Sequence, residues 1–220
     1  MISAALAWIA DAANWSGSAG IAMRLAQHVG VTVAIVVAAA AVALPVGIAI
    51  GHSGKGRAFV PLASGAARAL PTLGLLTLFA LWLGIGLAAP FLALVVLAIP
   101  PLLASAYSGV ESADGATVDA ARAIGMTPWQ VLRNVELPAA FPIIVGGLRT
   151  TVLQVASTAT LAAYTADFGL GRFLFAGMKT NHYEVMIGGA LLVIALTLLL
   201  DIVLAALQKT AAGRMKGSRT

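Results

Sequence analysis

Long apolar runs constrain the fold of this chain more than any other feature of its sequence. A helix needs about 20 residues to cross about 30 Å of hydrocarbon. Four runs reach that length, at residues 28–51, 61–83, 86–107 and 185–207, and a fifth, at 143–166, is less apolar but long enough. Only 10% of the residues are charged, whereas soluble domains carry about 25%. The sequence therefore predicts an all-α, polytopic integral membrane protein with about five transmembrane helices.

The predicted spans divide the chain into three parts. Residues 1–22 contain an apolar run that Asp11 ends after about nine positions, which is too short to span. These residues also lack the basic start of a signal peptide. We expect residues 1–22 to form an N-terminal extracytoplasmic segment, residues 23–207 the transmembrane domain, and residues 208–220 a basic cytoplasmic tail.

Glycine and proline mark features within the spans. Gly47 and Gly51 stand four residues apart, a pattern of small residues that lets two helices approach closely. The alternative is that glycine is simply common in such helices. Pro45, Pro71 and the pair Pro100–Pro101 lie inside or at the ends of spans, where neighbouring groups can satisfy the freed backbone. We expect kinks at these prolines.

Lysine and arginine predict the orientation, because positive residues in short loops are retained in the cytoplasm. With the N-terminus outside, eight basic residues face the cytoplasm, namely Lys55, Arg57, Arg122, Arg133, Lys209, Arg214, Lys216 and Arg219. The three that then face outside are Arg24, Arg172 and Lys179. This bias predicts an extracytoplasmic N-terminus and a cytoplasmic C-terminus. The last three basic residues of the tail are expected to hold it on anionic membrane lipid.

Residues 117–138, TVDAARAIGMTPWQVLRNVELP, form the most polar block of the chain. Thr117 is the predicted N-cap of a short helix, which ends where Gly125 can adopt a left-handed conformation. The run TPWQ at residues 127–130 offers a capping box with proline at the first helical position. Because Pro138 disfavours helix in the residue before it, we expect a cytoplasmic hairpin of two short helices. Two caps so close together favour a rigid docking surface over a hairpin that lies on the membrane.

This block resembles the EAA loop in the membrane subunits of bacterial ABC importers. In that pattern an acidic residue and two alanines are followed by a glycine, then by an aliphatic residue and Leu-Pro. The pattern falls here on Asp119, Ala120, Ala121, Gly125, Val135, Leu137 and Pro138. Aspartate replaces the usual glutamate and valine the usual isoleucine, and both changes are conservative. Residues 69–79, 147–164 and 169–185 also resemble the branch that imports glycine betaine, carnitine and choline, and the resemblance covers residues 25–207.

The resemblance implies a type I ABC importer permease fold and a transport subunit that is not an enzyme. The hairpin is then a coupling element seated on a cytoplasmic ABC ATPase dimer, which holds the ATP and Mg²⁺, so this chain is expected to bind no cofactor. The other implied partners are a second permease copy or a paralogue and an extracytoplasmic solute-binding protein. The implied location is the inner membrane of a bacterial cell. Alternatives are the same machine with another small solute, such as a methionine-type amino acid, and a secondary transporter that needs no ATPase.

Polar residues gather in the predicted span at residues 143–166. The candidates for lining a solute pathway are Gln154, Ser157, Thr158, Thr160 and Tyr164. Hydrogen bonds between helices are the alternative role for such side chains. Asp201 lies well inside an apolar run, where an acid usually finds a partner. We expect it to pair with Arg68 or Arg149, and a direct role in the pathway is the alternative.

The sequence does not support other chemical sites. GHSGKG at residues 51–56 lacks the spacing of a phosphate-binding loop and follows a predicted span, so we interpret it as a basic cytoplasmic turn. His28, His52 and His182 stand far apart without a carboxylate at ligand spacing, and the chain has no cysteine. We therefore expect neither a metal site nor a catalytic site. The basic residues are scattered, which argues against nucleic acid as a partner.

Overall fold

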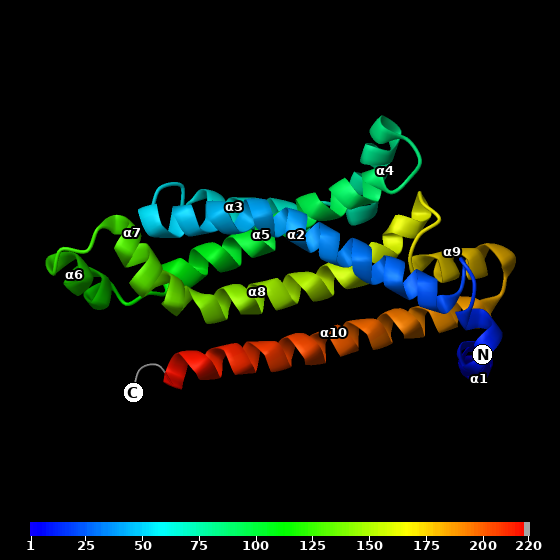
Figure 1. Ribbon diagram of the computed structural model, residues 1–220. Helices are drawn as coiled ribbons and strands as arrows, with labels where there is room; N and C mark the ends of the chain where they lie inside the picture. Colours follow the sequence, from blue (N-terminus) through cyan, green and yellow to red (C-terminus); the bar gives the residue numbers. More distant parts are fainter. Residues whose placement is uncertain (218–220) are drawn as a thin grey trace. The chain divides into compact units, whose positions relative to one another are not determined.

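The computed structural model describes residues 1–217, and the side chains of residues 1–67 and 69–209. Within that range every regular element is helical, which confirms the predicted all-α class. The helices are α1 (Ile2–Ala10), α2 (Ile21–Ser53), α3 (Phe59–Ala69), α4 (Thr72–Leu83), α5 (Ala88–Glu111), α6 (Gly115–Ala123), α7 (Pro128–Val131), α8 (Leu137–Thr158), α9 (Gly171–Thr180) and α10 (Tyr183–Gly217), as labelled in Figure 1. A 3₁₀ turn follows α1 and another follows α8, and a π turn follows α7.

Four helical stretches of the described chain are long and apolar enough to cross a membrane. They are Ile21–Ser53, Ala88–Glu111, Pro128–Tyr164 and Tyr183–Lys209. A fifth is present if α3 and α4 together count as one broken span, so the predicted number of about five agrees with the structure. The predicted span at residues 143–166 falls almost entirely within the third stretch, whose helix already begins at Pro128.

The predicted span at residues 61–83 is not one straight helix. It consists of two helices, α3 and α4, with a break at residues 70–71 between them. Pro71 precedes α4 in an extended conformation with ψ 117°, and proline has no N–H with which to continue the ladder of α3. The helix is therefore interrupted at Pro71, one of the prolines at which a kink was predicted, whereas Pro45, Pro100 and Pro101 lie inside uninterrupted helices.

The chain divides into two compact units. The first comprises Met1–Val37, Leu70–Leu97 and Val152–Asp201, and the second comprises Ala38–Ala69, Ala98–Thr151 and the remainder of α10. Because the boundaries fall inside α2, α5, α8 and α10, each of these helices contributes residues to both units.

A small hydrophobic core organises the first unit. Ile21 of α2 and Leu192 of α10 are buried in it, and Trp8 of α1 packs against it. The Trp8 ring meets the Phe173 ring of α9 edge to face, with the centroids 5.1 Å apart. A side chain at Gly188 of α10 would come within 2.5 Å of the Trp8 ring, so this glycine is what lets α1 approach. The nine residues of α1 are too few to span, as predicted.

An ion-pair network lies in the same unit. The buried Arg24 guanidinium donates to Oδ1 and to the backbone carbonyl of Asp167, at 2.6 and 2.7 Å. Arg172 reaches the same carboxylate from α9 at 3.0 Å. Two of the three basic residues assigned to the outside therefore share one acidic partner. His28, also buried, lies 2.8 Å from the carbonyl of Ala156 through its Nε2.

Close contact between α2 and α5 organises the second unit. A Cβ at Gly47 would lie 2.6 Å from the carbonyl of Leu103, and one at Gly51 would lie 2.7 Å from Cβ of Val110. Real Cβ atoms are not found so close to such neighbours, so only glycine lets these two backbones meet. The predicted close approach at this pair of glycines is confirmed.

Candidate functional site

The hairpin at residues 114–138 begins at an aspartate. Asp114 is the N-cap of α6, and its carboxylate accepts the backbone N–H of Thr117 at 2.9 Å and the Thr117 hydroxyl at 2.7 Å. The predicted cap at Thr117 is therefore wrong. Asp114 stands three residues upstream and can accept the N–H of the third helical residue, so the helix starts at Gly115. These hydrogen bonds, that of the Thr117 hydroxyl first, lower the pKa of the Asp114 carboxyl below its usual value.

α6 ends at a left-handed glycine, as predicted. Gly125 has φ +88°, its N–H donates to the carbonyl of Arg122 at 3.0 Å, and the N–H of Met126 donates to the carbonyl of Ala121 at 3.1 Å. These two hydrogen bonds define a Schellman motif. A Cβ at Gly125 would meet nothing within 4 Å. Glycine is therefore needed for its backbone conformation and not for space.

The second cap of the hairpin also matches its prediction. The N–H of Thr127 donates to the side-chain oxygen of Gln130 at 2.8 Å, and the N–H of Gln130 donates to the Thr127 hydroxyl at 3.4 Å. Pro128 occupies the first helical position of α7, where its missing N–H has no partner to lose. The turn between α6 and α7 is thus held by hydrogen bonds on both sides.

The predicted end of the second helix before Pro138 is wrong. α7 continues into a π turn over Leu132–Glu136, and α8 begins at Leu137. In the π turn the N–H of Leu137 donates to the carbonyl of Leu132, five residues back. Proline clashes with the carbonyl four residues before it in a regular α-helix, and the wider π turn leads the helix past Pro138. The hairpin is therefore built directly onto a membrane span.

The hairpin exposes some of the pattern residues and buries others. Asp119 and Ala120 of α6 are exposed, whereas Ala121 is buried. Asp119 forms an exposed pair with Arg122 at 3.7 Å, a kind of contact that stabilises little. Val135 and Leu137 are half-buried, and Gly125 and Pro138 are exposed.

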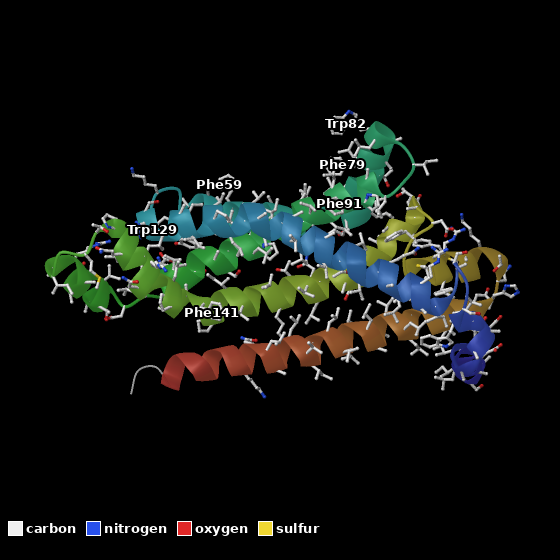
Figure 2. The ribbon with its side chains drawn as sticks, in the orientation of Figure 1. Phe59, Phe79, Trp82, Phe91, Trp129 and Phe141 are labelled. Carbon is white, nitrogen blue, oxygen red and sulfur yellow. The ribbon has the colours of Figure 1, made fainter. Side chains whose placement is uncertain are left out.

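Two large apolar side chains on the hairpin are open to solvent. Ile124 is 77% exposed and Trp129 is 66% exposed, and Figure 2 shows Trp129 on α7, near α6. Sequence analysis singled out neither side chain. In Figure 1 the hairpin projects past the C-terminal end of α5, so both side chains belong to the part of this unit that is best placed to meet a partner.

A polar contact between His52 and Glu136 at the base of the hairpin was missed by sequence reasoning. His52 Nδ1 at the end of α2 lies 2.6 Å from Glu136 Oε2 in the π turn. The two residues are 84 positions apart, so no local pattern links them. One signal was available in the sequence, because Glu136 stands four residues after the apolar Leu132, and a carboxylate on an apolar helix face needs a partner.

A cavity of about 360 Å³ adjoins this pair in the second unit. It lies between α6 and the ends of α2 and α5, and charged side chains of both signs line it. They are His52, Arg57, Glu111, Asp119, Arg122 and Glu136. The turn at residues 54–58, which contains Gly54 and Gly56 with positive φ, lies at the same cavity and is a turn between helices, as predicted.

The polar residues predicted for the pathway cluster where α8 gives way to a 3₁₀ turn, Ala159–Tyr164. The hydroxyls of Ser157, Thr158 and Thr160 donate to carbonyls three or four residues earlier. Gln154 and Tyr164 are exposed, and the ring of Tyr164 lies 5.9 Å from that of Phe175. These hydroxyls therefore bond within their own segment and not between helices. That the five polar residues line a solute pathway stays a prediction.

Two other predictions concern charged groups. Asp201 is half-buried on α10, and its pairing with Arg68 or Arg149 stays a prediction. Arg214, Lys216 and Arg219 of the tail lie outside the residues whose side chains the structure describes. Among the described residues there is no group of three or more His, Cys, Asp or Glu that could hold a metal ion.

Comparison with known proteins identifies the family. A family model for the inner membrane component of binding-protein-dependent transport systems matches residues 30–216. The chain is 33% identical to the glycine betaine/carnitine/choline transport system permease protein OpuCB of Bacillus subtilis (strain 168), with 84% of this chain and 86% of the relative covered. It is 32% identical to the choline transport system permease protein OpuBB of the same organism, with 86% and 88% covered. It is 33% identical to the carnitine transport permease protein OpuCB of Listeria monocytogenes, with 83% and 84% covered.

Solved structures show the same fold. A chain of the MetNI methionine ABC transporter in an inward-facing conformation has a TM-score of 0.74 at 21% identity, with 87% of this chain and 95% of that chain covered. A chain of an amino acid ABC transporter solved with histidines has a TM-score of 0.68 at 18% identity, with 85% and 92% covered. These likenesses confirm the predicted type I importer permease fold. The family, together with the apolar helices, also places the chain in the inner membrane as a multi-pass protein. The chain therefore belongs to the family of inner membrane components of binding-protein-dependent transport systems, and it is the permease subunit of an ABC importer, not itself an enzyme, that works with an ATPase and a solute-binding protein.

Proposed function

We propose that this permease imports compatible solutes, quaternary amines such as glycine betaine, carnitine and choline. Relatives at 32 to 33% identity over more than four fifths of the chain carry those solutes in their names. The methionine and amino acid transporters match in fold at 21 and 18% identity, which supports the shared architecture only. An osmoprotectant is therefore favoured over an amino acid as the imported solute.

The hairpin carries the mechanistic part of the proposal, which is that it docks the ATPase. Its two helices are closed by a Schellman motif and a capping box, so its surface is rigid before any partner binds. Rigid surfaces bind tightly because little conformational freedom is lost on association. Ile124 and Trp129 are exposed apolar side chains on it, and such side chains, tryptophan above all, are typical anchors of an interface. ATP and Mg²⁺ belong to the ATPase dimer in this proposal, and the permease binds neither.

The charge pattern and the packing of the second unit support the proposed orientation. The turn at residues 54–58 and α6 line one cavity, so Lys55, Arg57 and Arg122 belong to the same end of this unit. Since basic loops remain in the cytoplasm, that end faces the ATPase. The N-terminus is then extracytoplasmic and the C-terminal tail cytoplasmic.

The pathway is proposed to run between this chain and a second permease, either an identical copy or a paralogue. Exposed apolar side chains on α4, Leu81 at 82%, Trp82 at 77% and the following Ile85 at 94%, are available for lipid or for that second copy, and Trp82 is labelled in Figure 2. Gln154, Ser157, Thr158, Thr160 and Tyr164 supply the polar part of the pathway.

One reconstitution tests the substrate and the docking together. The permease is placed in vesicles with its ATPase and its solute-binding protein, and the uptake of labelled glycine betaine, choline and methionine is measured with and without ATP. We expect ATP-dependent uptake of the quaternary amines and little uptake of methionine. Preferential uptake of methionine overturns the substrate class, and uptake without ATPase or ATP overturns the importer mechanism.

A further inference from the structure

A close polar contact between His52 and Glu136 ties the end of α2 to the base of the hairpin. His52 lies in the last turn of α2, and Glu136 is the last residue of the π turn that leads from α7 into α8. Their contact, Nδ1 to Oε2, is 2.6 Å. The pair therefore connects one predicted membrane span to the segment through which the hairpin enters another.

Burial makes this contact difficult to break. The side chain of Glu136 is 7% exposed and that of His52 is 22% exposed. Separating the two leaves the carboxylate buried without its partner, which costs more than an ordinary exposed ion pair contributes. A displacement of the π turn is therefore expected to move the end of α2 with it.

The π turn is the part of the hairpin that can change its hydrogen-bond register. Leu137 donates to the carbonyl of Leu132 five residues back, whereas a regular α-helix uses the carbonyl four residues back. Single π turns inside helices are frequent at functional sites. Glu136 lies inside this turn, where a change of register shifts its carboxylate directly.

A cavity beside the pair lies between α2 and the other arm of the hairpin. It separates α6 from the ends of α2 and α5, and Val118 and Asp119 of α6 face it together with His52 and Glu136. Val118 and Asp119 of α6 therefore border open space on the side of α2 rather than a packed contact. The tie between the hairpin and α2 runs through the π turn.

We propose that His52 and Glu136 are positioning residues that carry the displacement of the ATPase-bound hairpin to α2, so that ATP hydrolysis stays coupled to opening of the pathway. This inference rests on the proposed docking of the ATPase on the hairpin. It assigns a role to two residues outside the pattern of Asp119, Gly125 and Leu137 on which the docking proposal was based.

The test compares variants that keep the hydrogen bond with variants that remove it. His52→Gln and Glu136→Gln retain a donor and an acceptor, whereas His52→Phe and Glu136→Leu remove them. The double variant His52→Phe/Glu136→Leu leaves no buried carboxylate unpaired, so it reports the loss of the link without that penalty. Ser53→Ala is the matched control, because its exposed hydroxyl binds the carbonyl of Ala49 in its own helix.

Three quantities are measured in vesicles containing the complete transporter: ATPase retained on the permease, ATP hydrolysed, and solute imported. We expect His52→Phe and the double variant to retain the ATPase and to hydrolyse ATP. The amount of solute imported per ATP should fall by a factor of about five or more, in line with the coupling energies of contacting residues. His52→Gln, Glu136→Gln and Ser53→Ala should stay near the wild-type ratio.

The inference is overturned if the double variant imports as much solute per ATP as the wild type, or if hydrolysis and uptake fall in the same proportion, which is the result of a purely structural role. The docking proposal fails separately, if Trp129→Ala retains the ATPase as well as the wild type does. A variant that loses coupling while it keeps its ATPase therefore supports the link through the pair and leaves docking intact.

Discussion

The backbone N–H of Met126 donates to the carbonyl of Ala121 at 3.1 Å, across the left-handed residue Gly125. This one hydrogen bond closes the turn that sets the direction of α6 relative to α7. Because Ala121 is buried inside the hairpin, the turn and the small hairpin core support each other. The geometry of the proposed docking surface thus depends on one backbone conformation.

Gly125→Ala should weaken ATPase docking. The left-handed conformation costs a residue with a Cβ about 1–2 kcal/mol, and nothing near Gly125 offsets that cost, although nothing blocks the Cβ either. Retention of the ATPase by the purified permease measures the effect. Gly115→Ala is the matched control, because its Cβ also meets nothing within 4 Å and its φ is not positive, so it should bind normally. Equal retention by the two variants contradicts the role of the turn.

Trp129→Ala should reduce the affinity for the ATPase by about 2 kcal/mol or more, as expected for a tryptophan that anchors an interface. The stability of the permease itself should not change, because Trp129 is 66% exposed in the isolated chain. Titration of the ATPase against permease in detergent measures the affinity, and a melting curve measures the stability. Phe59→Ala is the control, since Phe59 is an aromatic residue on α3 that is 60% exposed (Figure 2). A larger loss of affinity for Phe59→Ala would point to docking elsewhere.

Gly51→Val should destabilise the permease by about 1–3 kcal/mol, the usual cost of overpacking. Its new side chain meets Cβ of Val110 at 2.7 Å and the carbonyl of Tyr107 at 3.0 Å, so α2 and α5 have to move apart. The midpoint of thermal unfolding in detergent is the measurement. Gly30→Val in the same helix meets no neighbour within 4 Å and should shift the midpoint much less. Similar shifts for both variants indicate that helix propensity, not packing, is responsible.

The cap at Asp114 predicts a pH dependence of α6. Thr117 lowers the pKa of Asp114 in the folded hairpin, and a depressed pKa means that the carboxylate stabilises the fold above the unfolded value of about 3.9. That contribution is lost as the pH falls below about 3.9 and through the lowered pKa. Hydrogen exchange at the Thr117 amide measures it, against Asp114→Asn at each pH. Asparagine caps without titrating, so the two proteins should diverge only in acid. Parallel exchange at all pH values contradicts the ionised cap.

A reporter fused to the C-terminus should be detected in the cytoplasm, and one fused before α1 should be detected outside. The expectation rests on eight basic residues assigned to the cytoplasmic turn, hairpin and tail, against three assigned to the outside. A reporter inserted after Lys55 in the turn at residues 54–58 should also report the cytoplasm. An outside signal at that turn is incompatible with the proposed docking side.

Contacts between residues close in the sequence were predictable. The capping box joins Thr127 to Gln130, and the left-handed conformation falls on Gly125. Glycine and proline have backbone preferences that hold in any surroundings. The predicted cap at Thr117 was wrong because Asp114, three residues upstream, accepts the backbone N–H of Thr117 and starts the helix earlier. A pattern alone does not decide between two residues that are both good caps.

The sequence by itself determined the solvent around the chain, the number of long apolar helices, and the identity of the hairpin, because hydropathy, caps and residue spacing are local properties. Only the tertiary structure decided that the helix passes Pro138 through a π turn and that His52 meets Glu136. A proline can end a helix, or the helix can continue past it through a wider π turn. Which of the two occurs depends on how the turns on either side of the proline pack against the rest of the protein. A pair of residues 84 positions apart forms because two helices close on each other, and no short window of sequence contains both partners.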